Sequence, residues 1–161
     1  MLKLIAFFYY IYRVFMKKLL LISLLTLSMQ NALANSKCTI VYNTGNEVLK
    51  YIVDEMPAFN FENFDEVCKN LKNANAKVKL TSISSISDNQ TTAIVTSIVM
   101  DKNLPIYSDM SFNSMTWSQN RNTATEKNLT IDAVNNALNG ITKEHINSLN
   151  KNRKTLGYKS Y

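Results

Sequence analysis

The sequence predicts a single domain of the α+β class, in which helices cover one face of an antiparallel sheet. Apolar residues recur at spacings of three and four within residues 44–74 and within residues 124–156, which is typical of amphipathic helices. The segment between them, residues 77–118, is dense in valine, isoleucine and threonine, which is typical of strands. Helices combined with an antiparallel meander in one chain of this size are typical of an α+β domain.

Two helices and a short strand are predicted near the start of the domain. The β-branched run at residues 38–42 favours an extra first strand. Thr44, followed three residues later by a glutamate, predicts the N-terminus of a helix that ends before Pro57, since the residue before proline avoids helical geometry. Asn63 is expected to cap a second helix, because two acidic residues follow at its positive end.

A three-stranded antiparallel meander is expected next, over residues 77–80, 91–100 and 112–118. An extension of the first strand to residue 86 is the alternative, which the serines of residues 81–86 disfavour. Turn residues separate the first two strands, and a connection that contains Pro105 precedes the third. The middle strand is apolar on both faces, which is typical of a central strand covered on both sides.

A long C-terminal helix is predicted from about residue 124, with Thr123 as its N-cap and Gly157 at its C-terminal end. Gly140 costs about 1 kcal/mol relative to alanine within a helix, so a break near Gly140 is the alternative to one unbroken helix. Residues 158–161 are expected to form a flexible tail, and residues 35–157 the globular domain.

The first 34 residues have the three-part pattern of a secretory signal peptide. A basic start at Met16 precedes the apolar run Leu19–Leu27, and Ala32 and Ala34 form a small-residue cleavage site. We expect Met16 to be the true start, residues 16–34 the signal, and residues 1–15 an over-extended reading frame. The alternative is a start at Met1 with a membrane span over residues 4–29.

That span is disfavoured by its charges, because Arg13, Lys17 and Lys18 would lie in its middle at about 2.5–3.5 kcal/mol each. Signal removal leaves no membrane span in the expected mature chain. The formal net charge of +6 includes four basic residues of the signal, so the mature chain is about +2. It has no basic run with interleaved aromatic residues, and a nucleic-acid partner is therefore not expected.

The chain has two cysteines, Cys38 and Cys68, and both follow the cleavage site. In an oxidising compartment, an isolated pair predicts one disulfide. It would close a loop of about 30 residues and stabilise the fold by about 3–4 kcal/mol. A redox or metal pair is the alternative, but redox pairs favour C-x-x-C spacing and zinc requires more ligands. We expect no metal and no cofactor.

Three residues are candidates for a functional site. His145 is the only histidine, and its helical position places it within an apolar stripe. It is interpreted as a half-buried core residue, with a pH sensor or a catalytic base as the alternative. Tyr107 lies in the connection after Pro105 and is expected to be exposed. Trp117 is a candidate for a binding surface, although its position on the third strand favours the core.

These observations favour a small exported protein, periplasmic or secreted, that is not an enzyme and acts by binding another protein. Envelope assembly and inhibition or immunity are the roles considered. No serine lies in a G-x-S-x-G context, and three glycines leave no phosphate-binding loop. The alternative is a small exported hydrolase that uses His145. No sequence motif identifies a family.

Overall fold

The computed structural model describes residues 38–161. The predicted signal peptide, its cleavage residues Ala32 and Ala34 and the choice between Met1 and Met16 lie outside the described residues. In chain order, the described residues form β1 (Tyr42–Asn43), α2 (Glu47–Asp54), α3 (Phe64–Asn73), β2 (Ala76–Ile86), β3 (Thr91–Asp101), β4 (Tyr107–Ser118), α4 (Thr123–Asn139) and α5 (Lys143–Thr155).

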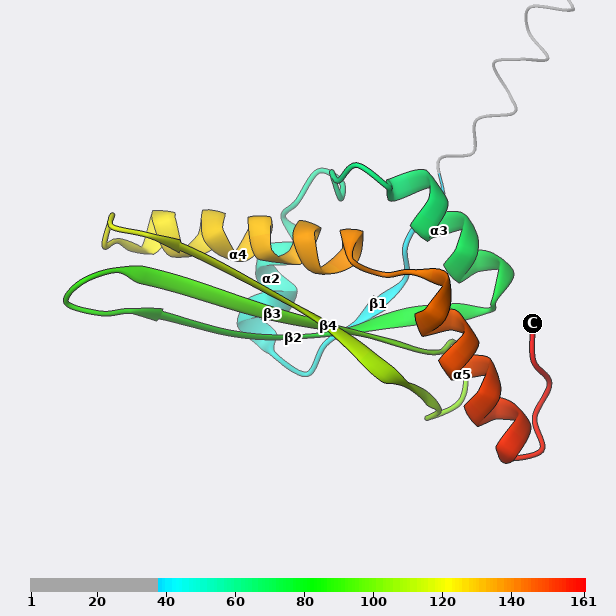
Figure 1. The fold of residues 1–161 in the computed structure, drawn as a ribbon. Helices are drawn as coiled ribbons and strands as arrows, with labels where there is room; N and C mark the ends of the chain where they lie inside the picture. The colour runs from blue at the N-terminus through cyan, green and yellow to red at the C-terminus, as the bar shows by residue number, and fades with distance from the viewer. Residues whose placement is uncertain (1–37) are drawn as a thin grey trace, which may run out of the picture. The chain divides into compact units, whose positions relative to one another are not determined.

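The four strands form one mixed sheet in the order β1-β2-β3-β4 (Figure 1). The predicted meander is confirmed, since β3 pairs antiparallel with both β2 and β4. The extra first strand is also present, but it has two residues instead of the predicted five and runs parallel to β2. The α+β class predicted from the sequence is therefore confirmed.

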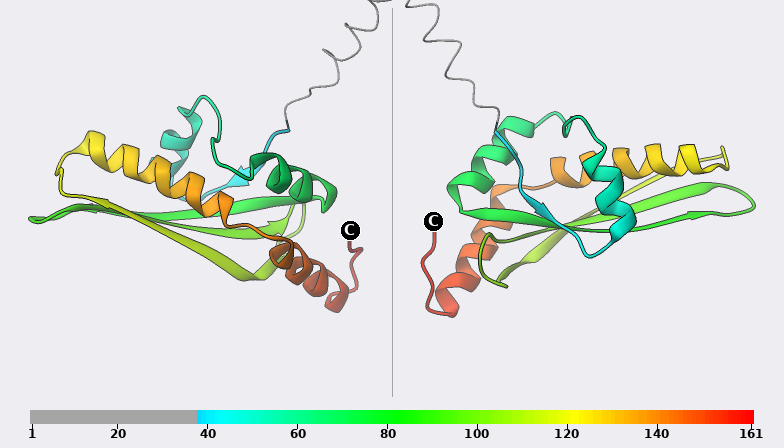
Figure 2. Two further views of the ribbon diagram at one scale, coloured as in Figure 1. Left: turned by 45° about the horizontal axis from the view of Figure 1, so that its top comes forward. Right: turned by 180° about the vertical axis from the view of Figure 1, so that it is seen from behind.

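The helices of the part of the chain that the structure describes cover one face of the meander (Figures 1 and 2). α4 lies across β3 and β4, and α5 packs near the β3–β4 turn. Beneath α4, Val78, Leu80, Val95 and Val99 are completely buried. The prediction that the middle strand is covered along both faces is wrong, because on the second face of β3 Ile94 is 37% exposed and Thr92, Thr96 and Ile98 are only partly buried. On that face only Met100, at the end of the strand, is buried.

Two of the three predicted N-caps differ from the observed ones by one or two residues. α3 follows Asn63 as predicted, although the Asn63 side chain makes no cap hydrogen bond. Asn46, not Thr44, caps α2, since its side-chain oxygen accepts from the Leu49 backbone N–H at 3.0 Å. Asn122, not Thr123, caps α4 in the same way, at 2.8 Å from the Thr125 nitrogen. Asparagine is a strong N-cap residue, so the adjacent asparagines take the role predicted for the threonines.

The predicted long C-terminal helix is two helices, because α4 ends at Asn139 and α5 begins at Lys143. Gly140 is the C-cap of α4, and its N–H donates to the Asn136 carbonyl. A Cβ at position 140 would overlap the Phe112 ring of β4, so the break brings the chain close to the sheet where only glycine fits. Gly157 follows the end of α5 in the left-handed conformation, with φ of 77°.

The predicted disulfide joins Cys38 to Cys68, with a Cα–Cα distance of 6.0 Å. Cys68 belongs to the buried stripe of α3 and is 1% exposed. The bridge therefore fixes the segment that leads into β1 against the buried side of α3.

A buried ion pair anchors α5 to the sheet. Arg153 is completely buried, and its Nε donates to Asp101 Oδ2 at 2.8 Å. The guanidinium also donates to the Ala74 and Asn75 carbonyls at 2.8 and 3.0 Å. Burial alone would raise the pKa of Asp101, but backbone hydrogen bonds and Arg153 lower it below its usual range.

The last residues of the chain contact α5. Tyr161 N donates to the side-chain oxygen of Asn150 at 3.2 Å, and the Tyr161 ring lies 5.0 Å from the Arg153 guanidinium carbon. The flexibility expected for residues 158–161 stays a prediction. No helix within residues 38–161 has the length and apolar character needed to cross a membrane.

Candidate binding surface

Among residues 38–161, no helix covers the side of the meander opposite α4 (Figure 1), and we call the outward-facing positions on that side the open face. Its members alternate along each strand with the buried residues and are cross-strand partners of one another. They are Lys77, Lys79, Thr81, Ile83 and Ser85 in β2, Thr92, Ile94, Thr96 and Ile98 in β3, and Tyr107, Ser111, Asn113, Met115 and Trp117 in β4. Met100 of β3, the partner of Tyr107, is only 4% exposed and is not counted among them.

An apolar row crosses the open face near the β2–β3 turn. Ile83 pairs with Ile94, and Ile94 pairs with Met115, so the three side chains stand side by side. Trp117 lies two residues beyond Met115 on the same face. Their exposed fractions are 74% for Ile83, 37% for Ile94, 64% for Met115 and 57% for Trp117. Contiguous exposed apolar side chains of this kind mark interaction sites in soluble domains.

The core interpretation of Trp117 is wrong, because the helices cover the opposite face of β4. Ser114 and Thr116 point toward α4 instead, and the Thr116 hydroxyl donates to the Leu129 carbonyl at 2.8 Å. Sequence reasoning did not single out Ile83 and Ile94 as site residues. The signal that could have identified them is the alternation of isoleucine with threonine or serine at every second position, over residues 81–85 of β2 and residues 92–98 of β3.

The other end of the open face carries lysine and tyrosine. Lys79 Nζ lies 5.3 Å from the centre of the Tyr107 ring, which is 38% exposed. Lys77 is the cross-strand partner of Met100, which in turn faces Tyr107. The sequence predicted exposure for Tyr107, and the structure places it on the same face as Trp117 but at the opposite end of β4.

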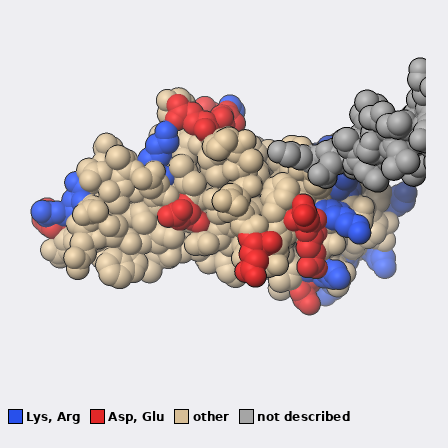
Figure 3. All heavy atoms as spheres, turned by 90° about the horizontal axis from the view of Figure 1, so that it is seen from above, with Lys and Arg blue, Asp and Glu red and all other residues tan. Residues whose placement is uncertain are grey.

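Acidic and basic side chains are interspersed on the helix-covered side (Figure 3). Asp54 accepts hydrogen bonds from Lys50, at 2.6 Å, and from Tyr42. Burial and the Asp54 carboxylate raise the pKa of Tyr42 to about 12. Glu55 is paired with Lys127 in the same way. These carboxylates act as ion-pair partners on the helices.

His145 occupies a structural position at the start of α5. Its Nδ1 accepts a hydrogen bond from the Thr142 backbone N–H at 3.1 Å, which completes a capping box. The side chain is 5% exposed, and its Nε2 is buried without a partner among the described residues. Burial lowers the pKa of His145, with a smaller opposing effect from Glu144.

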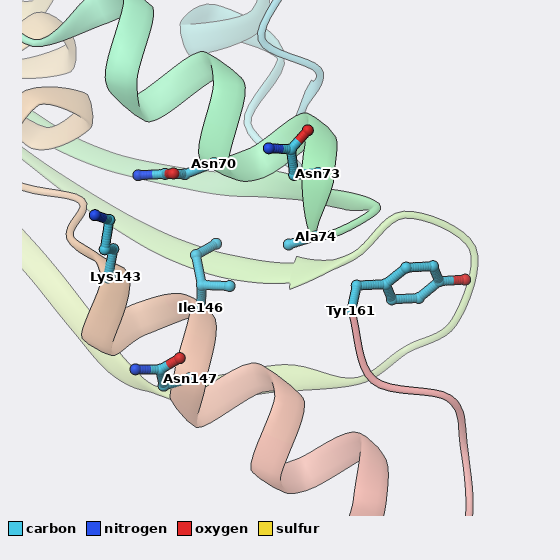
Figure 4. A pocket seen from close by; sticks show the side chains of 7 residues that line it. All are labelled: Asn70, Asn73, Ala74, Lys143, Ile146, Asn147 and Tyr161. Carbon is cyan, nitrogen blue, oxygen red and sulfur yellow. The ribbon is translucent and has the colours of Figure 1, made fainter.

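A shallow hollow lies between α3 and α5 (Figure 4). Asn70 and Asn73 line it from α3 and Asn147 from α5, while the Tyr161 ring points away from the other side chains. Lys143 is its one charged lining residue and is largely exposed. The hollow therefore offers amide hydrogen bonding but no general base.

Comparison of the chain with protein-family models, curated proteins and solved structures finds no match. Within residues 38–161, no group of three or more histidine, cysteine, aspartate or glutamate side chains is arranged to hold a metal ion. The candidate site therefore has to be judged on its own geometry, and the open face is the feature that stands out.

Proposed function

We propose that this protein is an exported, non-enzymatic protein that binds another protein through the open face. The observation that carries the proposal is the exposed row Ile83–Ile94–Met115 with Trp117 beside it. Aromatic residues and methionine are enriched at protein interfaces, and tryptophan is frequent among the residues that dominate binding energy. The disulfide and the predicted signal support a periplasmic or secreted location.

An open sheet face suits a protein partner better than a small molecule. Small-molecule sites are concave and surround their ligand, whereas the open face presents side chains along three adjacent antiparallel strands. Hydroxyl and amide groups lie next to the apolar row, and Thr96 Oγ1 donates to Asn113 Oδ1 at 2.6 Å across the strands. An apolar centre with polar surroundings is typical of transient protein interfaces.

The alternative, a hydrolase that uses His145, has less support. Nδ1 is engaged in the helix cap, and Nε2 is enclosed, so neither nitrogen is free to take a proton from a substrate. The Thr142 hydroxyl, 3.1 Å from Nδ1, belongs to the cap itself.

The test is photo-crosslinking in the cells that produce the protein. A photoreactive amino acid replaces Ile83, which is 74% exposed, and in a control chain it replaces Val48, which is 66% exposed on α2. We expect a protein adduct of defined mass from position 83 and none of that mass from position 48. Equal adducts at both positions, or none at position 83, would overturn the proposal.

A further inference from the structure

The charged members of the open face are two lysines, Lys77 and Lys79. Asp109 is also exposed in β4 between Tyr107 and Ser111, but it lies at the register shift of β4 and accepts a hydrogen bond from Asn152 of α5 at 2.9 Å. Neither lysine forms an ion pair with a described residue, whereas Lys50, Lys127 and Lys143 each lie within 4 Å of a carboxylate. Lys77 and Lys79 therefore have no carboxylate within ion-pair distance among the described residues, and they share this property with other lysines such as Lys69 and Lys151.

The lysines and the apolar row are separated by a fixed distance. Lys79 and Ile83 are four residues apart on β2 and point to the same side, which places their Cα atoms about 13 Å apart. The sheet holds this spacing, because both residues pair with β3 in regular register. Any partner that contacts both features must carry matching groups at a similar spacing.

The charge argues against a second copy of the chain as the occupant. Two open faces brought together would each contribute two unpaired lysines and no carboxylate to the contact. Like charges in a partly dehydrated interface are unfavourable. A second row, Thr81–Thr96–Asn113, crosses the open face between the lysines and the apolar row, and it is polar. It argues against a lipid surface, because these side chains would lose hydrogen bonds to water that lipid chains cannot replace.

We propose that the partner of the open face is a different protein, which carries carboxylate side chains about 13 Å from an apolar patch. The inference rests on the proposed function and adds the chemistry of the partner to it. The apolar patch covers Ile83, Met115 and Trp117, and the carboxylates pair with Lys77 and Lys79. Opposite charges of this kind accelerate association and select among partners.

The experiment repeats the crosslinking from position 83 in two charge variants of the full chain. One carries Lys77→Glu and Lys79→Glu, and the matched control carries Lys69→Glu and Lys151→Glu, two exposed lysines on α3 and α5. The two variants have the same net charge. We expect adduct formation to fall about tenfold or more in the first and to change less than twofold in the second.

The outcomes separate the two proposals. An adduct that persists undiminished in the Lys77→Glu, Lys79→Glu chain overturns the acidic partner and leaves the protein-binding function standing. An adduct with the mass of two copies of the chain also overturns it. Loss of every protein adduct, with cosedimentation of the purified protein on phosphatidylglycerol vesicles, overturns both proposals in favour of a membrane surface. Mass-spectrometric mapping of the adduct to an acidic segment of another protein supports the inference.

Discussion

The two faces of the meander are built from alternate residues of the same three strands, yet the side chains at their centres differ strongly in burial. On the covered face, Leu80, Val95 and Val99 are inaccessible to solvent. On the open face, Ile83 and Met115 are more than half exposed although they are as apolar as their neighbours. Apolar side chains on the first face stabilise the fold, whereas those on the second contribute little to it.

The comparison teaches that hydrophobicity alone does not assign a residue to the core. A period of two separates the faces, but which face is covered depends on where α4 and α5 pack. Substitutions can test this division of roles. For each one on the covered side, we expect a larger loss of unfolding free energy than for a matched substitution elsewhere.

The largest effect is expected at the buried ion pair of the covered side. Arg153→Ala leaves the Asp101 carboxylate and two carbonyls without their donor, and should lower the free energy of unfolding by about 3–5 kcal/mol. Urea denaturation measures the loss. Lys151→Ala, on an exposed position of the same helix, should change stability by less than about 0.5 kcal/mol. Equal losses in the two variants would show that Arg153 does not anchor α5.

A direct comparison of the faces uses two residues of β2. Leu80→Ala removes a completely buried side chain and should cost about 2–5 kcal/mol, whereas Ile83→Ala should cost less than about 0.5 kcal/mol. The midpoint and slope of chemical unfolding give both values. A loss above about 2 kcal/mol for Ile83→Ala would mean that the open face is not open in the native protein.

Gly140→Ala probes the close approach between the α4–α5 break and the sheet. The new methyl group would overlap the Phe112 ring, and the resulting rearrangement should cost about 1–3 kcal/mol. Gly45→Ala is the control, because nothing lies within 4 Å of a Cβ at that position. Thermal unfolding of the two variants checks the difference, and a Gly140→Ala protein as stable as the control would contradict it.

The smallest effect is a pH dependence from His145. Burial lowers its pKa, so the unfolded chain binds a proton that the folded chain does not, and stability should fall as the pH drops below about 7. Each unit of pKa difference corresponds to about 1.4 kcal/mol. His145→Gln keeps a cap acceptor and should flatten the profile between about pH 5 and 7. His145 is the only histidine. If the pH profile of stability is the same in His145→Gln as in the unmodified protein, the pH dependence comes from groups other than histidine.

The sequence was sufficient for the features that depend on local pattern. The strands of the meander, the pairing of Cys38 with Cys68 and the helices near Asn63 and Thr123 all follow from periodicity, capping residues and cysteine count. The sequence indicates the helix break at Gly140 only as the alternative to one long helix. The helical cost of a glycine can be read from the sequence, but the nearby Phe112 ring, which leaves no room for a side chain at position 140, cannot.

The rest depends on tertiary packing. Ile94 and Val95 have similar β propensity, and nothing local indicates that helices cover the side of Val95. Trp117 was assigned to the core for the same reason. Arg153 lies in a polar stretch of α5, so its burial could not be inferred before Asp101 and the Ala74 and Asn75 carbonyls were brought beside it.

The disulfide has a consequence for the order in which the domain is assembled. β1 pairs with β2 in parallel, and the partners Tyr42 and Val78 are 36 positions apart along the backbone. Through the bridge between Cys38 and Cys68, the same two residues are separated by only about 14 positions, which lowers the entropic cost of closing that loop by roughly 0.8 kcal/mol. Oxidation before folding thus shortens the loop that must close for the strand pairing with the largest sequence separation among the described residues. The reduced chain should therefore fold more slowly.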